Sequence, residues 1–341
     1  MTITVDGLDI ADPAHVDKAF QVRAQMAAES HPHGPAATRS SVRRQLLGNE
    51  LMGRHTLLAT VAGEPVGLLR MMFWDIEGSR DIAVCNLEVV PNHRRRRVGT
   101  TLLAHAIDEC IARAKPTVIG TGVLSTDTRG FWEGWLGLSC GLVERESELL
   151  LGDVELRLMQ DWVAQRTQRA SDYRLTHVRG AFPPELREAV ATLNTAMNDA
   201  PLDDLDVDPE IWTPDAVAAE DDLRRLRGET RWTTVAFAPN GDPAGLTAVL
   251  LNDDDPTFGV QSNTVVLDAH RERGIGRWLK ADMWQRLRAD RPELARLLVE
   301  NAASNNAMLA INDAMGFRET VRYADWQGDA AMMRDRLRDR S

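Results

Sequence analysis

An internal repeat limits the fold of this chain more than any other feature of its sequence. Gly99 and Gly276 each follow an arginine-rich turn, and they lie 177 residues apart (276 − 99). Gly137 in Leu-Gly-Leu and Gly316 in Met-Gly-Phe lie 179 residues apart (316 − 137). Two landmarks that recur in the same order at nearly the same spacing indicate two copies of one domain.

The pattern of predicted elements repeats as well. Each half reads as a strand, two helices, three strands, a helix, a strand and a short helix. Similar placement of glycines in two unrelated α/β domains is the alternative, but the recurring strand order and arginine-rich turn favour duplication. We predict a first domain at residues 1–152, a helical linker at 153–172 and a second domain at 173–341.

The composition is typical of a soluble chain, with 43% hydrophobic and 27% charged residues. A net charge of −11 disfavours general binding of nucleic acids, which requires a basic face. No apolar run reaches the roughly 18 residues of a membrane span, and the N-terminus lacks a secretory pattern. Cys85, Cys110 and Cys140 form no metal or disulfide pattern, so we expect a reduced, cytoplasmic protein without a metal site.

The stretch HRERGIGRWLK, His270–Lys280, gathers positive charge in this acidic chain. It lies where a predicted strand leads into a helix, and the first amide groups of a helix have no partner within it. A phosphate fits such a helix start, and glycines let its oxygens approach the backbone. We therefore predict a phosphate site at Gly274 and Gly276, with charged contacts from four side chains: Arg271, Arg273, Arg277 and Lys280.

Three phosphate-binding motifs compete for this turn. The GxxxxGK[ST] loop is absent, and the GxGxxG dinucleotide fingerprint lacks its third glycine. The third motif, [Arg/Gln]-x-x-Gly-x-[Gly/Ala] after a strand, is met by Arg271, Gly274 and Gly276. It is the coenzyme A turn of the GNAT superfamily of N-acetyltransferases. A nucleotide-binding oxidoreductase is a separate hypothesis, which binding of NAD without coenzyme A would support.

The resemblance to the GNAT superfamily extends over residues 263–318. TVVLDAHRERGIGRWLKADM resembles its motif A, and VENAASNNAMLAINDAMGF resembles its motif B. The wider chain resembles the tandem GNAT proteins of actinobacteria, the group that includes mycothiol synthase. The resemblance implies an α/β (α+β) fold of two tandem GNAT domains, each a mixed, mostly antiparallel, splayed sheet flanked by helices.

The resemblance further implies that acetyl-CoA lies in the splay of the second domain. The end of one strand would pair with the pantetheine arm, the turn would hold the pyrophosphate, and an Asn-rich segment would line the arm. The implied binding residues are Val266, Leu267, Arg271, Glu272, Arg273, Gly274, Ile275, Gly276, Arg277, Asn301, Asn305 and Met308.

The first copy departs from this pattern. Its turn reads Arg94-x-x-Arg97-x-Gly99, so Arg97 replaces the first glycine and its side chain occupies space at the backbone. The later stretch TRGFWEGWLGLSCG is rich in aromatic residues and has no asparagine. A degenerate scaffold and a second coenzyme A site are both open, and we place the active site in the second copy.

Acetyl transfer needs a base for the amine, donors to the carbonyl oxygen and a proton for the departing thiolate. In many GNAT enzymes a tyrosine four residues before the motif-B glycine gives this proton, but Asn312 stands there, and Glu133 in the first copy. Asn312 is expected to hydrogen-bond the sulfur. Glu300 and Asp268 are candidate bases at strand ends, with Glu88 as the counterpart in the first copy, and water chains are the alternative.

These features predict an acyltransferase that moves an acetyl group from acetyl-CoA to a primary amine of a small molecule, a metabolite or an antibiotic. Acyl transfer to a peptide or protein amine, and a coenzyme A-binding sensor or scaffold without catalysis, are the alternatives. Acceptor residues are expected in the least patterned segments, about 31–41 and 198–213. A monomer with pseudo-dimeric tandem domains and a homodimer are both open.

Overall fold

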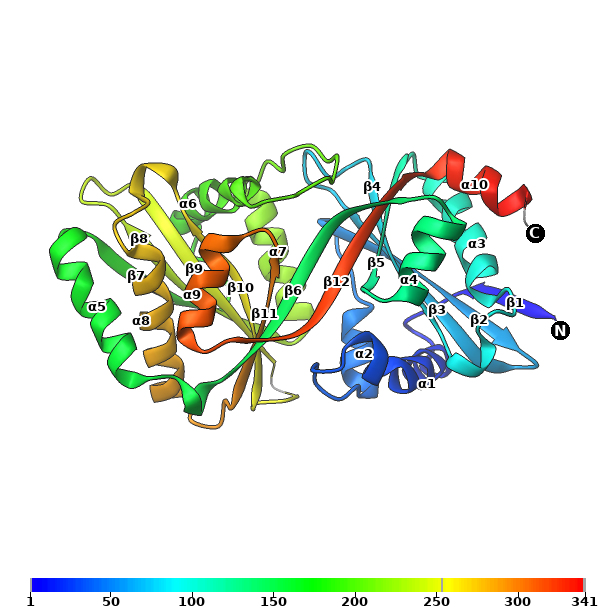
Figure 1. Cartoon of the computed structure of the whole chain (residues 1–341), viewed down its shortest axis with the longest axis horizontal. Helices are drawn as coiled ribbons and strands as arrows, with labels where there is room; N and C mark the ends of the chain where they lie inside the picture. The colour runs from blue at the N-terminus through cyan, green and yellow to red at the C-terminus, as the bar shows by residue number, and fades with distance from the viewer. Residues whose placement is uncertain (1, 253, 340–341) are drawn as a thin grey trace. The chain divides into compact units, whose positions relative to one another are not determined.

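In the computed structural model, which describes residues 2–252 and 254–339, the chain forms two compact units (Figure 1). Unit 1 comprises residues 2–144, 202–208 and 321–339. Unit 2 comprises residues 145–201, 209–252 and 254–320. Each unit is built on its own run of hydrogen-bonded strands with helices packed against them.

Within the residues that the structure describes, the first copy supplies six strands and four α-helices. The strands are β1 (Ile3–Gly7), β2 (Met52–Val61), β3 (Glu64–Trp74), β4 (Ile82–Val89), β5 (Thr117–Val123) and β6 (Ser139–Leu150). The helices are α1 (Pro13–Ser30), α2 (Arg39–Gln45), α3 (Val98–Ala112) and α4 (Thr126–Arg129), and a π-helical turn follows at Gly130–Trp135.

The second copy repeats this order after α5 (Leu156–Arg169). Its strands are β7 (Arg174–Arg179), β8 (Glu229–Phe237), β9 (Pro243–Asn252), β10 (Phe258–Val266), β11 (Arg296–Ala302) and β12 (Arg318–Asp329). Its helices are α6 (Pro184–Thr195), α7 (Pro214–Leu226), α8 (Ile275–Asp290), α9 (Asn306–Met315) and α10 (Ala330–Asp339).

The two units share one sheet topology. Unit 1 has the strand order β1-β2-β3-β4-β5-β12, and among its described pairs β4 with β5 is the parallel one. Unit 2 has the order β7-β8-β9-β10-β11, and among its described pairs β10 with β11 is the parallel one. The predicted mixed, mostly antiparallel sheets in tandem are confirmed.

Both parallel pairs open at one end. The pairing of β4 with β5 stops at Asn86 and Thr121, although both strands continue. The pairing of β10 with β11 stops at Gln261 and Val299, and β10 continues to Val266. The register of β10 on β9 also shifts after Gln261, which marks a β-bulge at the start of the splay. The predicted splay between these strands is therefore present in each unit.

The compact units cut across the two sequence copies. β6 begins in unit 1 and ends in unit 2, whereas β12 begins in unit 2 and ends in unit 1. There β12, from the second copy, pairs with β5 of the first copy, with Asp325 opposite Thr121. The division at 1–152, 153–172 and 173–341 describes the copies and stays a prediction. α5, in the predicted linker, packs on α8 through Met159 and Trp162.

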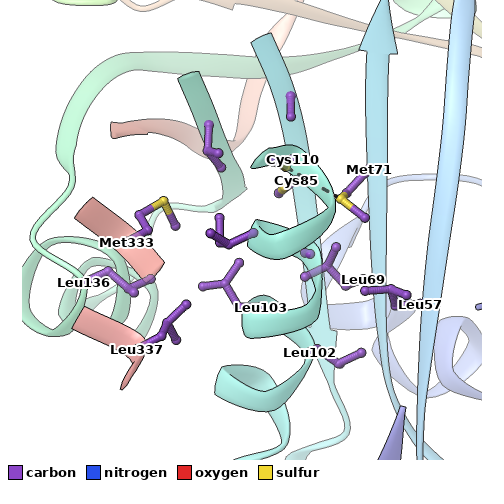
Figure 2. Close-up of a cluster of buried hydrophobic side chains, with 14 of the residues drawn as sticks. Leu57, Leu69, Met71, Cys85, Leu102, Leu103, Cys110, Leu136, Met333 and Leu337 are labelled. Carbon is purple, nitrogen blue, oxygen red and sulfur yellow. Dashed lines mark hydrogen bonds between the residues drawn. The ribbon is translucent and has the colours of Figure 1, made fainter. Parts of the chain in front are cut away.

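The core of unit 1 lies between its strands and two helices, α3 and α10 (Figure 2). Leu102 and Leu103 of α3 point toward the strands and toward α10, where Met333 and Leu337 are buried. The core of unit 2 packs α5 and α8 on strands and is rich in tryptophan and methionine. No helix among residues 2–252 and 254–339 is both long and apolar enough to cross a bilayer.

Candidate functional site

The turn before α8 has the backbone conformation of an anion-binding helix start. Glu272 and Gly274 both have left-handed φ angles, of 62° and 79°. Gly274 is the N-cap of α8 without a side-chain cap, and the N–H of Trp278 is the first to bond within the helix, to the Gly274 carbonyl. In the described ranges, the amide groups of residues 274–277 thus keep the open donors that an anion needs.

The turn before α3 in unit 1 repeats this geometry. Arg95 and Arg97 have φ angles of 56° and 68°, at the positions of Glu272 and Gly274. A Cβ added at Gly274 meets no atom within 4 Å, which explains how the fold accommodates Arg97 with its side chain exposed. The replacement of a glycine by Arg97 therefore leaves the backbone of the turn intact.

Arg271, predicted to bind phosphate, holds the turn together. Its Nε donates to the carbonyl of Val266 at 3.0 Å, and its guanidinium binds the carboxylates of Asp199 and Asp268. The carboxylate of Asp268, a candidate base, is accordingly engaged by Arg271, and its side chain is 76% exposed. Both side chains thus support the turn, and a half-buried environment for Asp268 is not found.

Arg273 and Arg277, in contrast, project from the turn into solvent. The guanidinium carbon of Arg277 lies 5.7 Å from the centre of the Trp162 ring on α5. No carboxylate within the described residues pairs with Arg273, so its charge is available to an anion. Ile275 is 1% exposed and anchors the helix start in the core, so its side chain does not face a ligand.

Gly276 leaves room beside the splay. A Cβ at this position would lie 3.7 Å from Val266 Cγ2 and 3.8 Å from Ile311 Cδ1, which are ordinary contacts. Packing inside the protein therefore does not require glycine here, and the space that glycine provides is on the path of a ligand that approaches the open amides.

The two predicted strand-end residues differ in their backbone contacts. The N–H of Leu267 donates to the carbonyl of Ala244, on the β9 side, at 3.0 Å. Because neighbouring residues of an antiparallel strand point their amides to opposite sides, Val266 faces the splay. Val266 therefore has the geometry to pair with an extended arm, whereas the N–H of Leu267 is already used.

The Asn-rich segment forms a connected polar group. Asn305 caps α9 and accepts from the N–H of Met308 at 3.2 Å, and Met308 is half-buried. Asn312 is 1% exposed, and its Nδ2 donates to Asn301 Oδ1 at 2.7 Å. The Oδ1 of Asn312 is buried without a hydrogen-bond partner among the described residues. An unpaired buried amide oxygen is costly, so a donor is missing at this point.

Two candidate bases sit in different environments. Glu300 follows Val299, the last β11 residue paired with β10, and its side chain is exposed. Glu88 is 4% exposed, and its Oε1 accepts from Arg23 at 2.6 Å, with Arg70 at 3.9 Å from Oε2. Although burial alone raises it, the two arginines hold the pKa of Glu88 below its usual value. Glu88 is therefore held in a buried ion-pair network with two arginines.

Sequence reasoning missed the environment of Lys280. It was expected beside the phosphate site, but it lies a turn further along α8, 1% exposed, with Nζ 5.8 Å from the centre of the Phe317 ring. Burial lowers its pKa to about 7. The sequence contained a signal for this placement. Lys280 follows Gly276 by four residues, and this spacing puts both residues on the same face of a helix.

The bulge in β10 is supported by a second group that sequence reasoning missed. Gln261 is 5% exposed, and its Nε2 donates to the carbonyl of Ala248 at 2.8 Å and to Thr247 Oγ1 at 3.1 Å. The hydroxyls of Thr247 and Thr264 lie 2.8 Å apart. This buried network satisfies polar groups where the strand register shifts, so it fixes the beginning of the splay.

Together these residues fit a molecule with a phosphate at one end and an extended arm. Open amides and free guanidinium groups stand at the helix start, Gly276 leaves space beside them, and the splay offers an unpaired strand edge along Val266. Coenzyme A has this shape and charge, so the residues of unit 2 fit it. The turn and splay of unit 1 offer the same backbone features.

The comparisons with known proteins agree with this geometry. Residues 22–137 match a family model described as acetyltransferase (GNAT) family. The chain is similar to the solved structure of a tandem GNAT protein from the clavulanic acid biosynthesis pathway, with 21% identity, a TM-score of 0.76, and coverage of 96% of this chain and 99% of that chain. Curated proteins give no match.

Two further solved structures are similar over most of this chain. A GCN5-related N-acetyltransferase from Sphaerobacter thermophilus has 16% identity and a TM-score of 0.67, and the match covers 96% of each chain. A GCN5-related glucosamine N-acetyltransferase region of a fungal β-N-acetylglucosaminidase has 14% identity and a TM-score of 0.65, covering 96% of this chain and 38% of that chain. These similarities show the fold.

The family match falls on the first copy, the one with Arg97 in place of a glycine. This agrees with the preserved turn of unit 1, and the first copy is closer to the family than its altered motif indicated. A dinucleotide-binding domain has a largely parallel, doubly wound sheet. Each unit has a mixed sheet with one described parallel pair, so the oxidoreductase hypothesis loses its structural basis.

Proposed function

We propose that this chain, which has the tandem GNAT fold and matches the GNAT acetyltransferase family over residues 22–137, transfers an acetyl group from acetyl-CoA to a primary amine of a small molecule. The observation that carries the proposal is the turn of unit 2. It combines an uncapped helix start, the exposed Arg273 and Arg277 and an adjacent splay between β10 and β11.

Each part of this site has a separate task. The amides of residues 274–277 and the guanidinium groups of Arg273 and Arg277 bind the pyrophosphate. The N–H of Val266 pairs with the pantetheine arm, as an added strand does. The exposed carboxylate of Glu300, beside the splay, takes the proton of the acceptor amine.

A small acceptor is favoured by two similar structures. One is a tandem protein from the biosynthesis of clavulanic acid, and the other is a glucosamine N-acetyltransferase region. Glucosamine carries a primary amine on a small molecule. An amino sugar is therefore the first class of acceptor to test.

Calorimetry with acetyl-CoA tests the binding half of this proposal. Gly276→Glu places a carboxylate at the open helix start of unit 2, and Gly99→Glu is the matched change in unit 1. We expect Gly276→Glu to abolish the binding event assigned to unit 2, while Gly99→Glu leaves it unchanged. Loss of binding from Gly99→Glu alone would move the active site to unit 1.

Thiol release from acetyl-CoA, measured with a panel of small amines, tests the catalytic half. We expect release that depends on the amine and that Gly276→Glu removes. Tight binding of acetyl-CoA without release for any small amine, peptide amine or protein amine would favour the sensor or scaffold alternative. Binding of NAD without coenzyme A would contradict the proposal as a whole.

A further inference from the structure

Lys280 is a buried amine without a carboxylate partner. It is one of three lysines in the chain, with Lys18 and Lys115. Its side chain is among the largest that are fully buried, and within the described residues its ammonium meets the face of the Phe317 ring and no carboxylate. A buried charge without a partner destabilises a fold, so packing alone does not account for this lysine.

The first copy shows which residue packing alone selects at this position. Leu103 lies four residues after Gly99, as Lys280 lies four residues after Gly276, and both follow a helix start with the same backbone. Leu103 is 0% exposed and is surrounded by apolar side chains, including Leu136 (Figure 2). One fold position thus carries leucine in one copy and lysine in the other.

The charged side chains on the elements around α8 have other partners or are exposed. On α8 and β8, Asp282 binds His177, and Arg231 binds Glu220 and Asp221. On α9 and β11, Asp313 binds Arg145, Arg296 binds Glu148, and Glu300 is exposed. On α5, Arg157 and Asp161 are exposed. Burial is accordingly the one influence on the pKa of Lys280, which it lowers to about 7.

Lys280 lies on α8 between residues at the levels of the open and the closed end of the splay. One turn before it, Gly276 is beside Val266, at the open end. One turn after it, Trp284 joins the hydrophobic cluster that contains Val299, where the two strands are paired again. In the proposed complex, an arm whose phosphates sit at the helix start would run toward this closed end and bring its terminal sulfur over α8.

A polar group that lacks a donor belongs to α9, the helix that precedes Phe317. The N–H of Phe317, whose ring faces the ammonium, donates to the carbonyl of Asn312 at 3.0 Å. The Oδ1 of Asn312 is the buried oxygen without a partner. Neither Asn312 nor Asn301 can release a proton at neutral pH. The ammonium of Lys280, which lies 5.8 Å from the centre of the Phe317 ring, can release one.

We propose that Lys280 is the proton donor to the sulfur of coenzyme A, an inference that rests on the proposed acyl transfer. The acceptor nitrogen forms a bond to the acetyl carbon, and the carbon–sulfur bond breaks with its electron pair on sulfur. The ammonium of Lys280 gives a proton to that sulfur. The acceptor nitrogen loses one proton when the amide forms. That proton restores the ammonium of Lys280, so the enzyme is unchanged at the end of the step.

Coenzyme A and its desulfo analogue test the contact directly. With only three lysines, a chain labelled with ¹³C at lysine Cε gives few signals, and Lys280→Leu assigns the one of interest. We expect the pKa of Lys280 to rise in the complex with coenzyme A, through pairing with the thiolate, and to rise less in the complex with desulfo-coenzyme A. Identical titration curves in the two complexes would overturn the inference.

This measurement separates the inference from the function on which it rests. It needs no acceptor amine, so it succeeds or fails whatever the acceptor is. If wild type binds coenzyme A and the two complexes titrate alike, the inference alone fails. If wild type does not bind coenzyme A, the proposed function fails and the inference with it.

Kinetics with Lys280→Leu, the residue of the first copy, provide a second readout. We expect the melting temperature to rise by about 5 °C, because an unpaired buried charge is removed, while kcat falls about 100-fold. The wild-type rate should fall as the pH rises past the pKa of Lys280, and the variant should lack this descending limb. A variant with unchanged kcat and higher stability would show that Lys280 is only a packing residue.

Discussion

Arg94 and Arg271 hold equivalent turns by the same contact. The Nε of each donates at 3.0 Å to the carbonyl of the last residue of the preceding strand, Val89 or Val266. Each guanidinium also binds a carboxylate from its own unit, Glu29 or Asp199. The duplication has therefore preserved a contact between side chain and backbone, in addition to the order of the elements.

Arg271→Ala is expected to weaken binding of coenzyme A about tenfold, because the turn that presents the amides loses a charged hydrogen bond worth about 1.5 kcal/mol. Calorimetry measures the dissociation constant. Arg94→Ala is the matched control, with its effect confined to unit 1. Equal losses of affinity in unit 2 from both variants would contradict the assignment.

Gly274→Ala and Gly276→Ala should separate folding from binding. Alanine at 274 must keep a φ of 79°, so we expect a loss of about 1 kcal/mol of stability, although its Cβ has open space. Alanine at 276 makes ordinary contacts, so the melting temperature should change little while the affinity for coenzyme A falls. A binding loss for Gly274→Ala with none for Gly276→Ala would reverse this assignment.

Glu88→Gln is expected to destabilise unit 1 by about 3 kcal/mol, because it leaves Arg23 and Arg70 buried without a carboxylate. The lowered pKa of Glu88 gives stability that is present above its unfolded value and is lost as the pH falls through its folded value. Urea unfolding at several pH values measures both effects. Asp127→Asn, in an exposed pair with Arg95, should change stability by under about 0.5 kcal/mol.

Asp325→Asn is expected to stabilise unit 1 by about 1 kcal/mol at pH 8. Burial raises the pKa of Asp325 from 3.8 to about 6, against the hydrogen bond from Thr121. Because the folded pKa is raised, the native state loses stability as the pH rises from 3.8 to about 6, and the variant escapes this loss. Thermal unfolding should show the gain at pH 8 and none near pH 4. A gain of equal size at both pH values would point to a cause other than titration.

A chain that ends at Thr320 should lose the fold of unit 1, although the deleted residues belong to the second copy. β12 and α10 supply Trp326, Met333 and Leu337 to the core of unit 1. Limited proteolysis followed by mass spectrometry should show cleavage in α1 and α3 of the shortened chain. Deletion of residues 340–341 alone is the control, and protection of α3 in the longer deletion would refute the expectation.

Local patterns carried most of the fold prediction. The repeated order of predicted strands and helices and the glycine landmarks identified two tandem domains, and the turn at Gly274 was recognised because its motif is continuous in sequence. The exchange of β6 and β12 was not predicted, since strand pairing over such distances leaves no local signal. Asp268 stays a candidate base, but the sequence does not reveal its contact with Arg271 or its exposed side chain.

The candidate site was predicted less evenly. Lys280 was predicted to contact the phosphates because of its charge alone. Its position in the period of α8 instead places its side chain in the interior, away from Arg277. The presence of Arg97 left a degenerate scaffold and a second coenzyme A site both open; in the structure a residue with an exposed side chain keeps the left-handed conformation, and the backbone of the turn is preserved. A sequence motif specifies the types of residue at its positions. The role of each side chain depends on its burial and on the direction in which it points.

The exchanged strand sets an order of events in the cell. Unit 1 cannot complete its sheet until β12 has left the ribosome, although residues 2–144 are made first. During the synthesis of nearly all of the second copy, the edge of β5 therefore waits unpaired, with the apolar face of α3 uncovered by α10. A premature stop before β12 leaves unit 1 without the strand that pairs with β5, whereas β6, which ends in unit 2, is already made.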